Sequence, residues 1–336
     1  MTLPESRARE LLAEFSRQKI LVVGDLMLDR YIYGAVERIS PEAPVPIVHV
    51  HRDSEVAGGA CNVAANINAL GGACALSGLV GTDTHGDQLL KMLDDQGVDV
   101  DGVFRSAETI TTVKSRVVAD GQQVVRVDRE DFNGESVCCS EDFLNVLRTA
   151  AEDATGIIIE DYGKGVVHQP VVDACISLAR EKGIPCGLDP KDNYDLKLDG
   201  ITLVKPNRNE AFSAVGLPDQ SKQADAATDT ALDEVGQTLF ERWSPEFLLM
   251  TLGPQGMMVF EDATERRHHV HTRAKEVFDV SGAGDTVIAT CMLALASGAT
   301  PVEAAELANY AAGVVVGKLG TVACSPEELL ASLGDS

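Results

Sequence analysis

The sequence predicts an α/β fold in three layers, with a mostly parallel central sheet between two layers of helices. Short apolar runs that suit buried strands recur along the chain, at 20–23, 157–159, 184–188, 201–204, 247–251 and 257–260. Helical patterns lie between many of these runs, at 61–70, 86–96, 141–152, 169–182 and 226–242. Strands that alternate with helices in this way form parallel sheets with both faces covered.

Two segments break the alternation and predict a small β-sheet lid. Residues 31–50 contain YIYG and then PEAPVPIVHV, which is rich in β-forming residues but interrupted by prolines, as in edge strands. Residues 112–128 place Asp120-Gly121 between β-branched segments, a strong signal for a two-residue hairpin. Neither segment fits the parallel sheet, so we interpret both as insertions that form a lid over the site. An exposed lid with Val, Ile and Tyr on one face also suits a homodimer contact.

Composition and charge favour a soluble cytoplasmic protein that acts on small molecules. The length of 336 residues fits one large domain, so we expect a single domain over 1–336. The net charge of -24 repels nucleic acid and anionic membranes, which argues against both as partners. The N-terminus resembles an amphipathic helix and not a signal peptide, and no apolar stretch is long enough to span a bilayer. The eight cysteines lack zinc spacing and suit free thiols in a reducing compartment.

The carboxyl ends of the predicted strands are the first place to look for a site, because ligands of parallel sheets bind there. The polar and glycine residues that follow the apolar runs are Asp25, Asp29, Asp161, Asp189, Asn207 and Gly253. An acidic surface repels anionic substrates at long range. A site for such substrates therefore needs clustered cations and Mg²⁺.

The stretch DVSGAGD at 279–285 precedes a helix of small residues and predicts a phosphoryl-transfer site. Gly282, Ala283 and Gly284 allow close approach to a ligand, and their N–H groups at a helix N-terminus suit an anion. Asp285 would lie in the first turn, where it could take a proton from an attacking hydroxyl. The alternative is a glycine turn with Asp285 as a capping residue.

The segment KPNRNE, after the run at 201–204, is a candidate for nucleotide and metal binding. Asn207 and Glu210 lie three apart at the start of a helix, where they could order Mg²⁺ and its waters. We include Arg208 and Asn209, between them, among the candidate nucleotide-binding residues. The alternative is a plain capping box.

Two glycine-containing segments complete the pattern. Thr251, Gly253 and Gly256 follow another strand and could line a nucleotide, although an ordinary hairpin turn explains them equally well. The pair at 58–59 precedes Asn62, whose amide could bind sugar hydroxyls. Gly58 and Gly59 would let the chain pass close to that ligand, and a simple helix start is the alternative.

Taken in this order, GG at 58–59, N-x-x-E at 207–210 and DVSGAGD at 279–285 resemble the PfkB, or ribokinase-like, carbohydrate kinases. The resemblance covers nearly the whole chain, with Val280 where that family usually has Thr. It implies a ribokinase-like three-layer sandwich with a β-lid, and ATP with Mg²⁺ as cofactors. It also implies Asp285 as the catalytic base, Gly282 to Gly284 as an anion hole, and Asn207 with Glu210 at Mg-ATP.

The resemblance extends to the segment 308–321, which is similar to the family's adenine-side helix. It implies that Asn309 and Ala312 lie near the adenine base. It also implies that the 318–320 turn lies near a monovalent cation, such as K⁺, with Asp279 and Ser281.

The segments 24–48, 161–165 and 188–191 are similar to the kinase half of the bacterial lipopolysaccharide heptose enzyme. That likeness implies phosphorylation of D-glycero-D-manno-heptose 7-phosphate at O1, in ADP-heptose biosynthesis. No H-x-x-H nucleotidyltransferase motif occurs, so we expect a stand-alone kinase. Asp29 matches the family's sugar-binding Asp. The cations that could bind the 7-phosphate are Arg38, Lys114, Arg116, Arg126, Lys164 and Lys191, and a solvated surface position is the alternative for each.

Three functional hypotheses remain: the heptose phosphate kinase, a kinase of this family for another sugar, sugar phosphate or nucleoside, and a different class. The segment 24–48 disfavours the second. A dehydrogenase needs G-x-G-x-x-G after the first strand, where this chain has Gly24-Asp25-Leu26. A non-catalytic sugar-binding regulator should lack a base, yet Asp285 is present.

Overall fold

The computed structural model describes residues 3–131, 134–191, 195–221, 225–261, 267–274, 276–320 and 322–334. Its main sheet has nine strands in the order β13-β12-β11-β10-β9-β8-β1-β4-β5. Their bounds are β1 Lys19–Gly24, β4 Ala73–Gly81, β5 Asp99–Ser106, β8 Gly156–Glu160, β9 Cys186–Asp189, β10 Leu203–Val204, β11 Phe247–Thr251, β12 Met257–Phe260 and β13 Arg267–Val270. From β5 to β11 the strands are parallel, and β12 and β13 extend the sheet antiparallel. The predicted mostly parallel sheet is confirmed.

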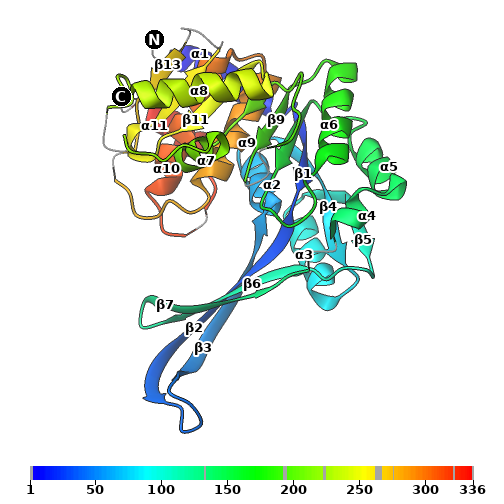
Figure 1. Cartoon of the computed structure of the whole chain (residues 1–336), viewed down its shortest axis with the longest axis vertical. Helices are drawn as coiled ribbons and strands as arrows, with labels where there is room; N and C mark the ends of the chain where they lie inside the picture. Colours follow the sequence, from blue (N-terminus) through cyan, green and yellow to red (C-terminus); the bar gives the residue numbers. More distant parts are fainter. Residues whose placement is uncertain are drawn as a thin grey trace.

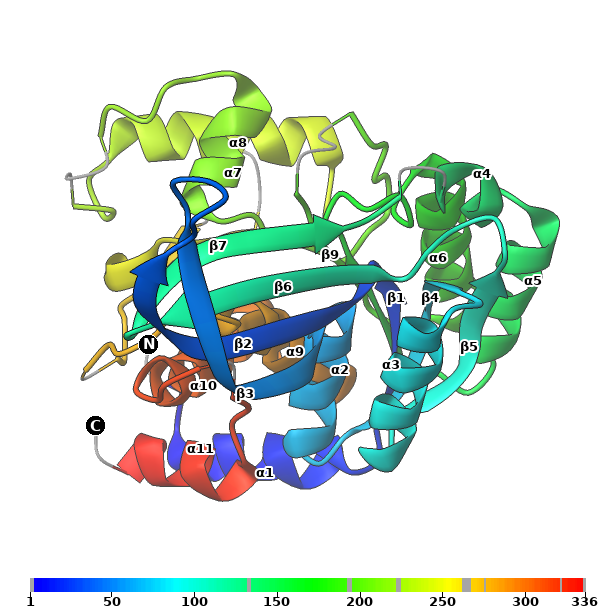
Figure 2. The same ribbon diagram turned by 90° about the horizontal axis from the view of Figure 1, so that it is seen from below.

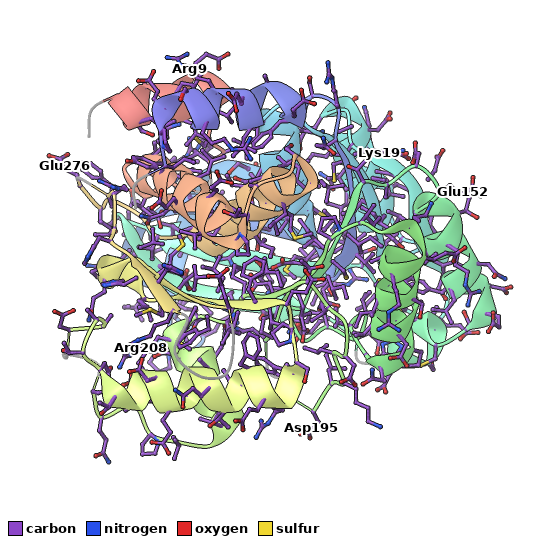
Figure 3. All side chains as sticks on the ribbon, turned by 90° about the horizontal axis from the view of Figure 1, so that it is seen from above. Arg9, Lys19, Glu152, Asp195, Arg208 and Glu276 are labelled. Atoms are coloured by element: carbon purple, nitrogen blue, oxygen red, sulfur yellow. The ribbon has the colours of Figure 1, made fainter. Side chains whose placement is uncertain are left out.

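Helices cover both faces of this sheet (Figures 1 and 3). One layer holds α1 Glu5–Phe15, α2 Ala60–Ala69, α3 Thr84–Asp95, α9 Ala283–Ala296, α10 Pro301–Val316 and α11 Pro326–Gly334. The other holds α4 Gly134–Cys138, α5 Glu141–Ala150, α6 Gln169–Lys182, α7 Arg208–Val215 and α8 Thr230–Trp243. Side chains alternate between the two faces of a strand, so a buried strand packs against both layers. In β1, Ile20 packs against the first layer and Leu21 against the second. None of the described helices is both long and apolar enough to cross a membrane.

A second, four-stranded sheet projects from the body as a long arm that begins next to α2 (Figures 1 and 2). Its order is β3-β2-β6-β7, with β2 Leu26–Ile39, β3 Pro46–Gly59, β6 Thr112–Ala119 and β7 Gln122–Arg129. We call this sheet the lid. The predicted hairpin turn is confirmed, since Asp120 and Gly121 both have positive φ, 52° and 79°.

The bounds of the first lid segment are wider than the predicted 31–50. Strand β2 already begins at Leu26, and β3 continues to Gly59. The prolines that suggested interruption lie in the connection or at the first residue of β3, Pro46, where a missing N–H disturbs no ladder. The lid therefore reaches back to the end of β1, next to the carboxyl edge of the main sheet.

Candidate active site

Asp285 lies in the first turn of α9 and is buried, with 7% of its surface exposed. Its carboxylate accepts two hydrogen bonds, from Asn62 Nδ2 at 2.5 Å and from the Tyr162 hydroxyl at 2.9 Å. Burial raises the pKa of Asp285, whereas these two hydrogen bonds lower it. The result is a carboxylate held in one orientation by side chains from α2 and from the loop after β8.

The N-termini of α2 and α9 are held together by a short chain of polar contacts. Gly282 caps α9 with φ of 76°, a left-handed conformation that favours glycine. The Thr286 hydroxyl lies 2.7 Å from Asn66 Oδ1, and Asn66 Nδ2 donates to the carbonyl of Asn62 at 2.8 Å. These buried contacts fix the position of Asn62 relative to Asp285.

The loop that carries Tyr162 is held by Asp25, which follows β1. The Asp25 carboxylate accepts N–H bonds from Tyr162 at 2.8 Å, and from Lys164 and Val166 at 3.0 Å each. Burial raises the pKa of Asp25, and these backbone hydrogen bonds lower it. Asp25 thus orders the loop and is not exposed to a ligand, since only 1% of its surface is accessible.

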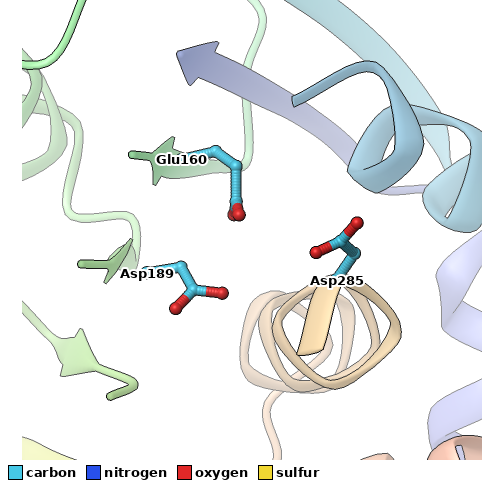
Figure 4. Close-up of side chains that lie close together, drawn as sticks. All are labelled: Glu160, Asp189 and Asp285. Atoms are coloured by element: carbon cyan, nitrogen blue, oxygen red, sulfur yellow. The ribbon is translucent and has the colours of Figure 1, made fainter. Parts of the chain in front are cut away.

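Three carboxylates gather at the carboxyl ends of the central strands (Figure 4). Ligand atoms of Glu160, Asp189 and Asp285 all lie within 4.8 Å of one another. Burial, and then repulsion from Asp189, raises the pKa of Glu160 well above its ordinary value. Burial raises the pKa of Asp189 to about 7, although Lys205 opposes the shift.

Lys205 is the cation of this cluster. Its Nζ lies 2.6 Å from Asp189 Oδ2, and only 2% of the residue is exposed. Burial lowers the pKa of Lys205, but Asp189 and Glu160 outweigh that effect and raise it overall. Within the described part of the chain, Glu160 Oε2 has no hydrogen-bond partner.

Two adjoining pockets open at the N-terminus of α9. The larger, of ≈ 680 Å³, is lined by Glu160, Tyr162, Asp189, Lys205, Asn207, Arg208, Asn209, Glu210 and Asp285, among others. The smaller, of ≈ 190 Å³, is mostly apolar and includes Gly256, Val287, Asn309, Ala312 and Val316. Both include Thr251, Gly253 and Gly284 in their walls, so they are contiguous. An apolar recess joined to a polar one suits a nucleotide.

The predicted anion hole differs from the expectation at one residue. Ala283 already donates its N–H to the carbonyl of Val280 at 3.3 Å, because Gly282 folds the chain into a tight turn. The N–H groups of Gly282 and Gly284 have no acceptor among the described residues. Gly284 lies beside Lys205, whose Nζ would be 3.5 Å from a Cβ added at that glycine. Gly284, Lys205 and Asp285 therefore line the same pocket.

Asn207 and Glu210 form the capping box that was the alternative to a metal site. Asn207 Oδ1 accepts from the N–H of Glu210, and Glu210 Oε2 accepts from the N–H of Asn207. Glu210 Oε1 also accepts from Lys191 Nζ at 3.2 Å. All three residues line the larger pocket, so the capping box presents oxygen atoms to it.

Arg208, a predicted nucleotide-binding residue, forms ion pairs within the protein. Its guanidinium donates to Asp219 and Asp229, at 2.8 Å and 2.6 Å, and to Ser221 at 2.9 Å. These pairs tie the start of α7 to the loop before α8 (Figure 3). Because the carboxylates already neutralise it, Arg208 stabilises the wall of the pocket. Its neighbour Asn209 is exposed at the pocket's edge.

The segment with Thr251, Gly253 and Gly256 is both a hairpin turn and a pocket wall. It connects antiparallel β11 and β12, and Gly256 has φ of 87° where a Cβ would lie 2.1 Å from the carbonyl of Val270. Asn309 donates its amide to the carbonyl of His271 at 2.6 Å. That amide thus holds the rim of the smaller pocket, whose wall includes Asn309 and Ala312.

Asp279 holds the loop before α9. Its carboxylate accepts from the N–H groups of Ser281 and Gly320, at 2.9 Å and 3.1 Å. The backbone bond from Ser281 contributes most to lowering the pKa of Asp279, so the carboxylate is ionised. Asp279, Ser281 and the 318–320 turn thus lie side by side, and a monovalent cation at this place stays a prediction.

Asp29 lies at the base of the lid and pairs with Arg116, with Oδ1 and Nη1 2.5 Å apart. Gly58 leaves room for this carboxylate, because an added Cβ would lie 2.2 Å from Asp29 Oδ2. Gly59, with φ of 62°, turns the chain from β3 into α2. Asn62, the predicted sugar-binding residue, donates its Nδ2 to Asp285.

The remaining predicted cations are dispersed. Arg38 is exposed near the tip of the lid, nine residues after Asp29 along β2, and thus far from Asp285. Lys164 pairs with Glu130 at 2.7 Å. Lys191 lines the larger pocket, beside Glu210.

Sequence reasoning missed Tyr162, Glu160, Lys205 and Asn66 as members of the site. The signal was present for two of them: Glu160 ends an apolar run, and Lys205 begins KPNRNE. Tyr162 and Asn66 act through contacts with residues more than a hundred positions away, at Asp285 and Thr286. No local pattern reports such contacts.

Sequence comparison shows which known proteins are similar to this chain. Residues 17–328 match the pfkB family carbohydrate kinase profile. The Bifunctional protein HldE of Mesorhizobium japonicum is 41% identical over 330 residues, 98% of this chain and 64% of the relative. That of Geobacter metallireducens is 43% identical over 315 residues, 94% of this chain and 62% of the relative. The chain thus spans less than two thirds of these relatives' length.

Solved structures are similar in fold. An Arabidopsis thaliana ribokinase complexed with ribose and ATP has a TM-score of 0.73 and 21% identity, over 95% of this chain and 99% of that one. Phosphofructokinase-2 from Escherichia coli in complex with potassium has a TM-score of 0.71 and 21% identity, over 95% and 98%. At such identity these likenesses show the fold alone, which is ribokinase-like. With the profile match, they lead to one conclusion: the chain belongs to the pfkB family of carbohydrate kinases.

Proposed function

We propose that this chain transfers the γ-phosphoryl group of ATP to O1 of D-glycero-D-manno-heptose 7-phosphate. The product would be the β-1,7-bisphosphate, an intermediate of ADP-heptose biosynthesis for the lipopolysaccharide core. The observation that carries the proposal is the likeness to HldE proteins across 94% or more of the chain. The buried Asp285 carboxylate, at the mouth of a nucleotide-sized pocket, supplies the chemistry.

In the proposed reaction, Asp285 takes the proton from the O1 hydroxyl as that oxygen attacks phosphorus. Asn62 and Tyr162 donate to the carboxylate and keep it aimed at the acceptor. The anomeric hydroxyl is more acidic than an ordinary alcohol, so a carboxylate is a sufficient base. The N–H groups of Gly282 and Gly284 would stabilise charge on the transferred group, because they are oriented before the reaction begins.

ATP would occupy the two contiguous pockets, with adenine in the apolar one and the phosphates in the polar one. Ala312 and Val316 would pack against the base, and Lys191 would lie near the phosphates. Lys205 offsets part of the charge of Glu160 and Asp189, which would otherwise repel the nucleotide.

Mg²⁺ fits the donor set, because the available groups are carboxylate and amide oxygens, including the unpartnered Oε2 of Glu160. Asn207 and Glu210 would hold the ion through water. When bound, Mg²⁺ would offset charge on the nucleotide phosphates. A monovalent cation, such as K⁺, would lie near Asp279 and Ser281, where a carboxylate is ionised and the loop is ordered.

We further propose that the protein acts in the cytoplasm as a homodimer that pairs through the lid. The lid carries many exposed apolar side chains: Ile39, Val45, Val50, Val56, Val124, Val125 and Val127. Such a surface is typical of an interaction site. The eight cysteines are free thiols, as expected in a reducing compartment.

An assay of ADP release with a panel of sugars and sugar phosphates tests the proposed reaction. We expect turnover with the heptose 7-phosphate and a loss of about 10²- to 10⁴-fold in kcat for Asp285→Asn, because the general base is removed. Asp95→Asn, an exposed carboxylate at the end of α3, is the matched control and should not change the rate. Preference for ribose or fructose 6-phosphate would refute the proposed acceptor, and full activity of Asp285→Asn would refute the base.

A further inference from the structure

One face of the lid gathers charged side chains next to the site. The register places Lys114 opposite both Asp29 on β2 and Asp128 on β7. The next residues on the same face, two positions along, are Arg116 and Arg126. Side chains opposite one another in a sheet project from the same face, so these charges form two adjacent rows.

This face is directed toward the catalytic carboxylate. The Nζ of Lys114 lies 5.9 Å from the centroid of the Tyr162 ring. The hydroxyl of that ring donates to Asp285 at 2.9 Å. Tyr162 therefore contacts the base through its hydroxyl and lies beside Lys114 through its ring.

Within the described part of the chain, Lys114 differs from the cations around it because no carboxylate pairs with it. Arg116 pairs with Asp29 at 2.5 Å, Arg126 with Asp128 at 2.8 Å, and Lys164 with Glu130 at 2.7 Å. Among the described residues, no carboxylate lies within ion-pair distance of Lys114.

The environment of Lys114 also disfavours its charge. Lys114 is partly buried, and this burial, with repulsion from Lys164, lowers its pKa. A partly buried ammonium that lacks a partner costs free energy, which an anionic ligand would recover. The cation thus adjoins the acceptor side of the site without a protein group to neutralise it.

The nucleotide is not the anion that this position suits. Tyr162 lines the larger pocket, whereas neither Lys114 nor Lys164 lines either of the two nucleotide pockets. Lys114 Nζ lies over the Tyr162 ring, 5.9 Å from its centroid, and Lys164 follows Tyr162 by two residues. An anion bound there belongs to the acceptor, at the end remote from the hydroxyl that faces Asp285.

We propose that Lys114, assisted by Lys164, binds the phosphate of a phosphorylated sugar acceptor whose reacting hydroxyl lies at the opposite end of the molecule. This inference rests on the proposed function, in which the acceptor is a 1-hydroxy sugar with a terminal phosphate. It assigns acceptor selectivity to a lid residue, in a protein whose net charge of -24 otherwise repels phosphorylated sugars. Lys114 supplies a local positive charge that would attract the phosphate despite that repulsion.

The test compares Lys114→Met with wild type on two acceptors, the heptose 7-phosphate and the unphosphorylated heptose, by ADP release. We expect kcat/KM for the phosphorylated acceptor to fall roughly 10- to 100-fold, as for loss of a charged hydrogen bond. The rate with the unphosphorylated heptose and the KM for ATP should stay unchanged. Lys114→Arg should retain part of the selectivity, and Arg38→Met, an exposed lid cation, should behave as wild type.

An equal loss of kcat/KM with both acceptors would show that Lys114 only supports the lid structure. No loss with either acceptor would exclude a role in binding. Either result would overturn the inference. The proposed function fails separately, if wild type does not use the heptose 7-phosphate. In that case the same ratio is measured with the preferred acceptor and its dephosphorylated form. A preferred acceptor that carries no phosphate would overturn the Lys114 inference as well.

Discussion

The edge of the main sheet and the lid differ in how far their charged side chains are buried. At the sheet edge, Glu160 and Lys205 are almost inaccessible, only 13% of the Asp189 side chain is exposed, and burial raises the pKa values of both carboxylates. In the lid, the ion pair of Asp29 and Arg116 lies on strands that are open to solvent over much of their length. A buried group is oriented before the substrate arrives, whereas a partly exposed one gains from the substrate's own charge. We infer that the sheet edge performs the chemistry and the lid selects the acceptor.

The largest effect on stability should come from the sheet edge. Lys205→Met leaves the carboxylates of Asp189 and Glu160 without their cation, so we expect a loss of about 3–5 kcal/mol in the free energy of unfolding, as for other broken buried pairs. Urea denaturation at neutral pH measures it. Arg9→Met removes an exposed pair with Glu5 and serves as control, with an expected change below about 1 kcal/mol. Equal losses for both variants would contradict the difference between buried and exposed charges.

A smaller effect is expected for the orientation of the base. Tyr162→Phe removes one of the two donors to Asp285, so kcat should fall by roughly tenfold, equivalent to one hydrogen bond. The lost hydrogen bond had lowered the pKa of Asp285, so that pKa should rise further above its ordinary value. Because the base must be ionised, the acidic limb of the kcat profile should then move to higher pH. A limb that stays in place or moves to lower pH would show that Tyr162 does not act on Asp285.

The smallest effect on stability is expected in the lid. Arg116→Met breaks the partly exposed pair with Asp29, so the free energy of unfolding should change by only about 0–1 kcal/mol. The KM for the acceptor should nevertheless rise, since Asp29 loses the cation that orients it. Thermal unfolding and steady-state kinetics of the same preparation measure both. A large loss of stability with an unchanged acceptor KM would reverse the assignment.

The sequence was sufficient to predict the parallel sheet and the lid because both follow from local patterns. The runs that became β1, β8 and β11 are apolar throughout, and Asp120-Gly121 has the residues that a tight hairpin requires. The start of the lid was predicted five residues late. Leu26 and Leu28 are buried, so the beginning of β2 has the composition of a core strand and not of an exposed lid.

The site was predicted in outline and not in its contacts. The turn before α9 and the position of Asp285 follow from DVSGAGD, because glycine spacing reports a local backbone conformation. The hydrogen-bond partners of Asn62 and Arg208 cannot be predicted in this way. Asp285 and Asp229 are distant from them in the sequence and come within hydrogen-bond distance only in the folded chain. The proposed role of Lys114 in phosphate binding also depends on the fold. The nearby carboxylates of Asp29 and Asp128 pair with Arg116 and Arg126 instead.

The acceptor specificity ratio tests this division of roles most directly. It is kcat/KM for the heptose 7-phosphate divided by kcat/KM for the unphosphorylated heptose, measured side by side for wild type, Asp285→Asn and Lys114→Met. The account predicts that Asp285→Asn lowers both rates and keeps the ratio, whereas Lys114→Met lowers the ratio by roughly 10- to 100-fold. A ratio that changes in Asp285→Asn, or stays constant in Lys114→Met, would contradict the separation of chemistry from selection.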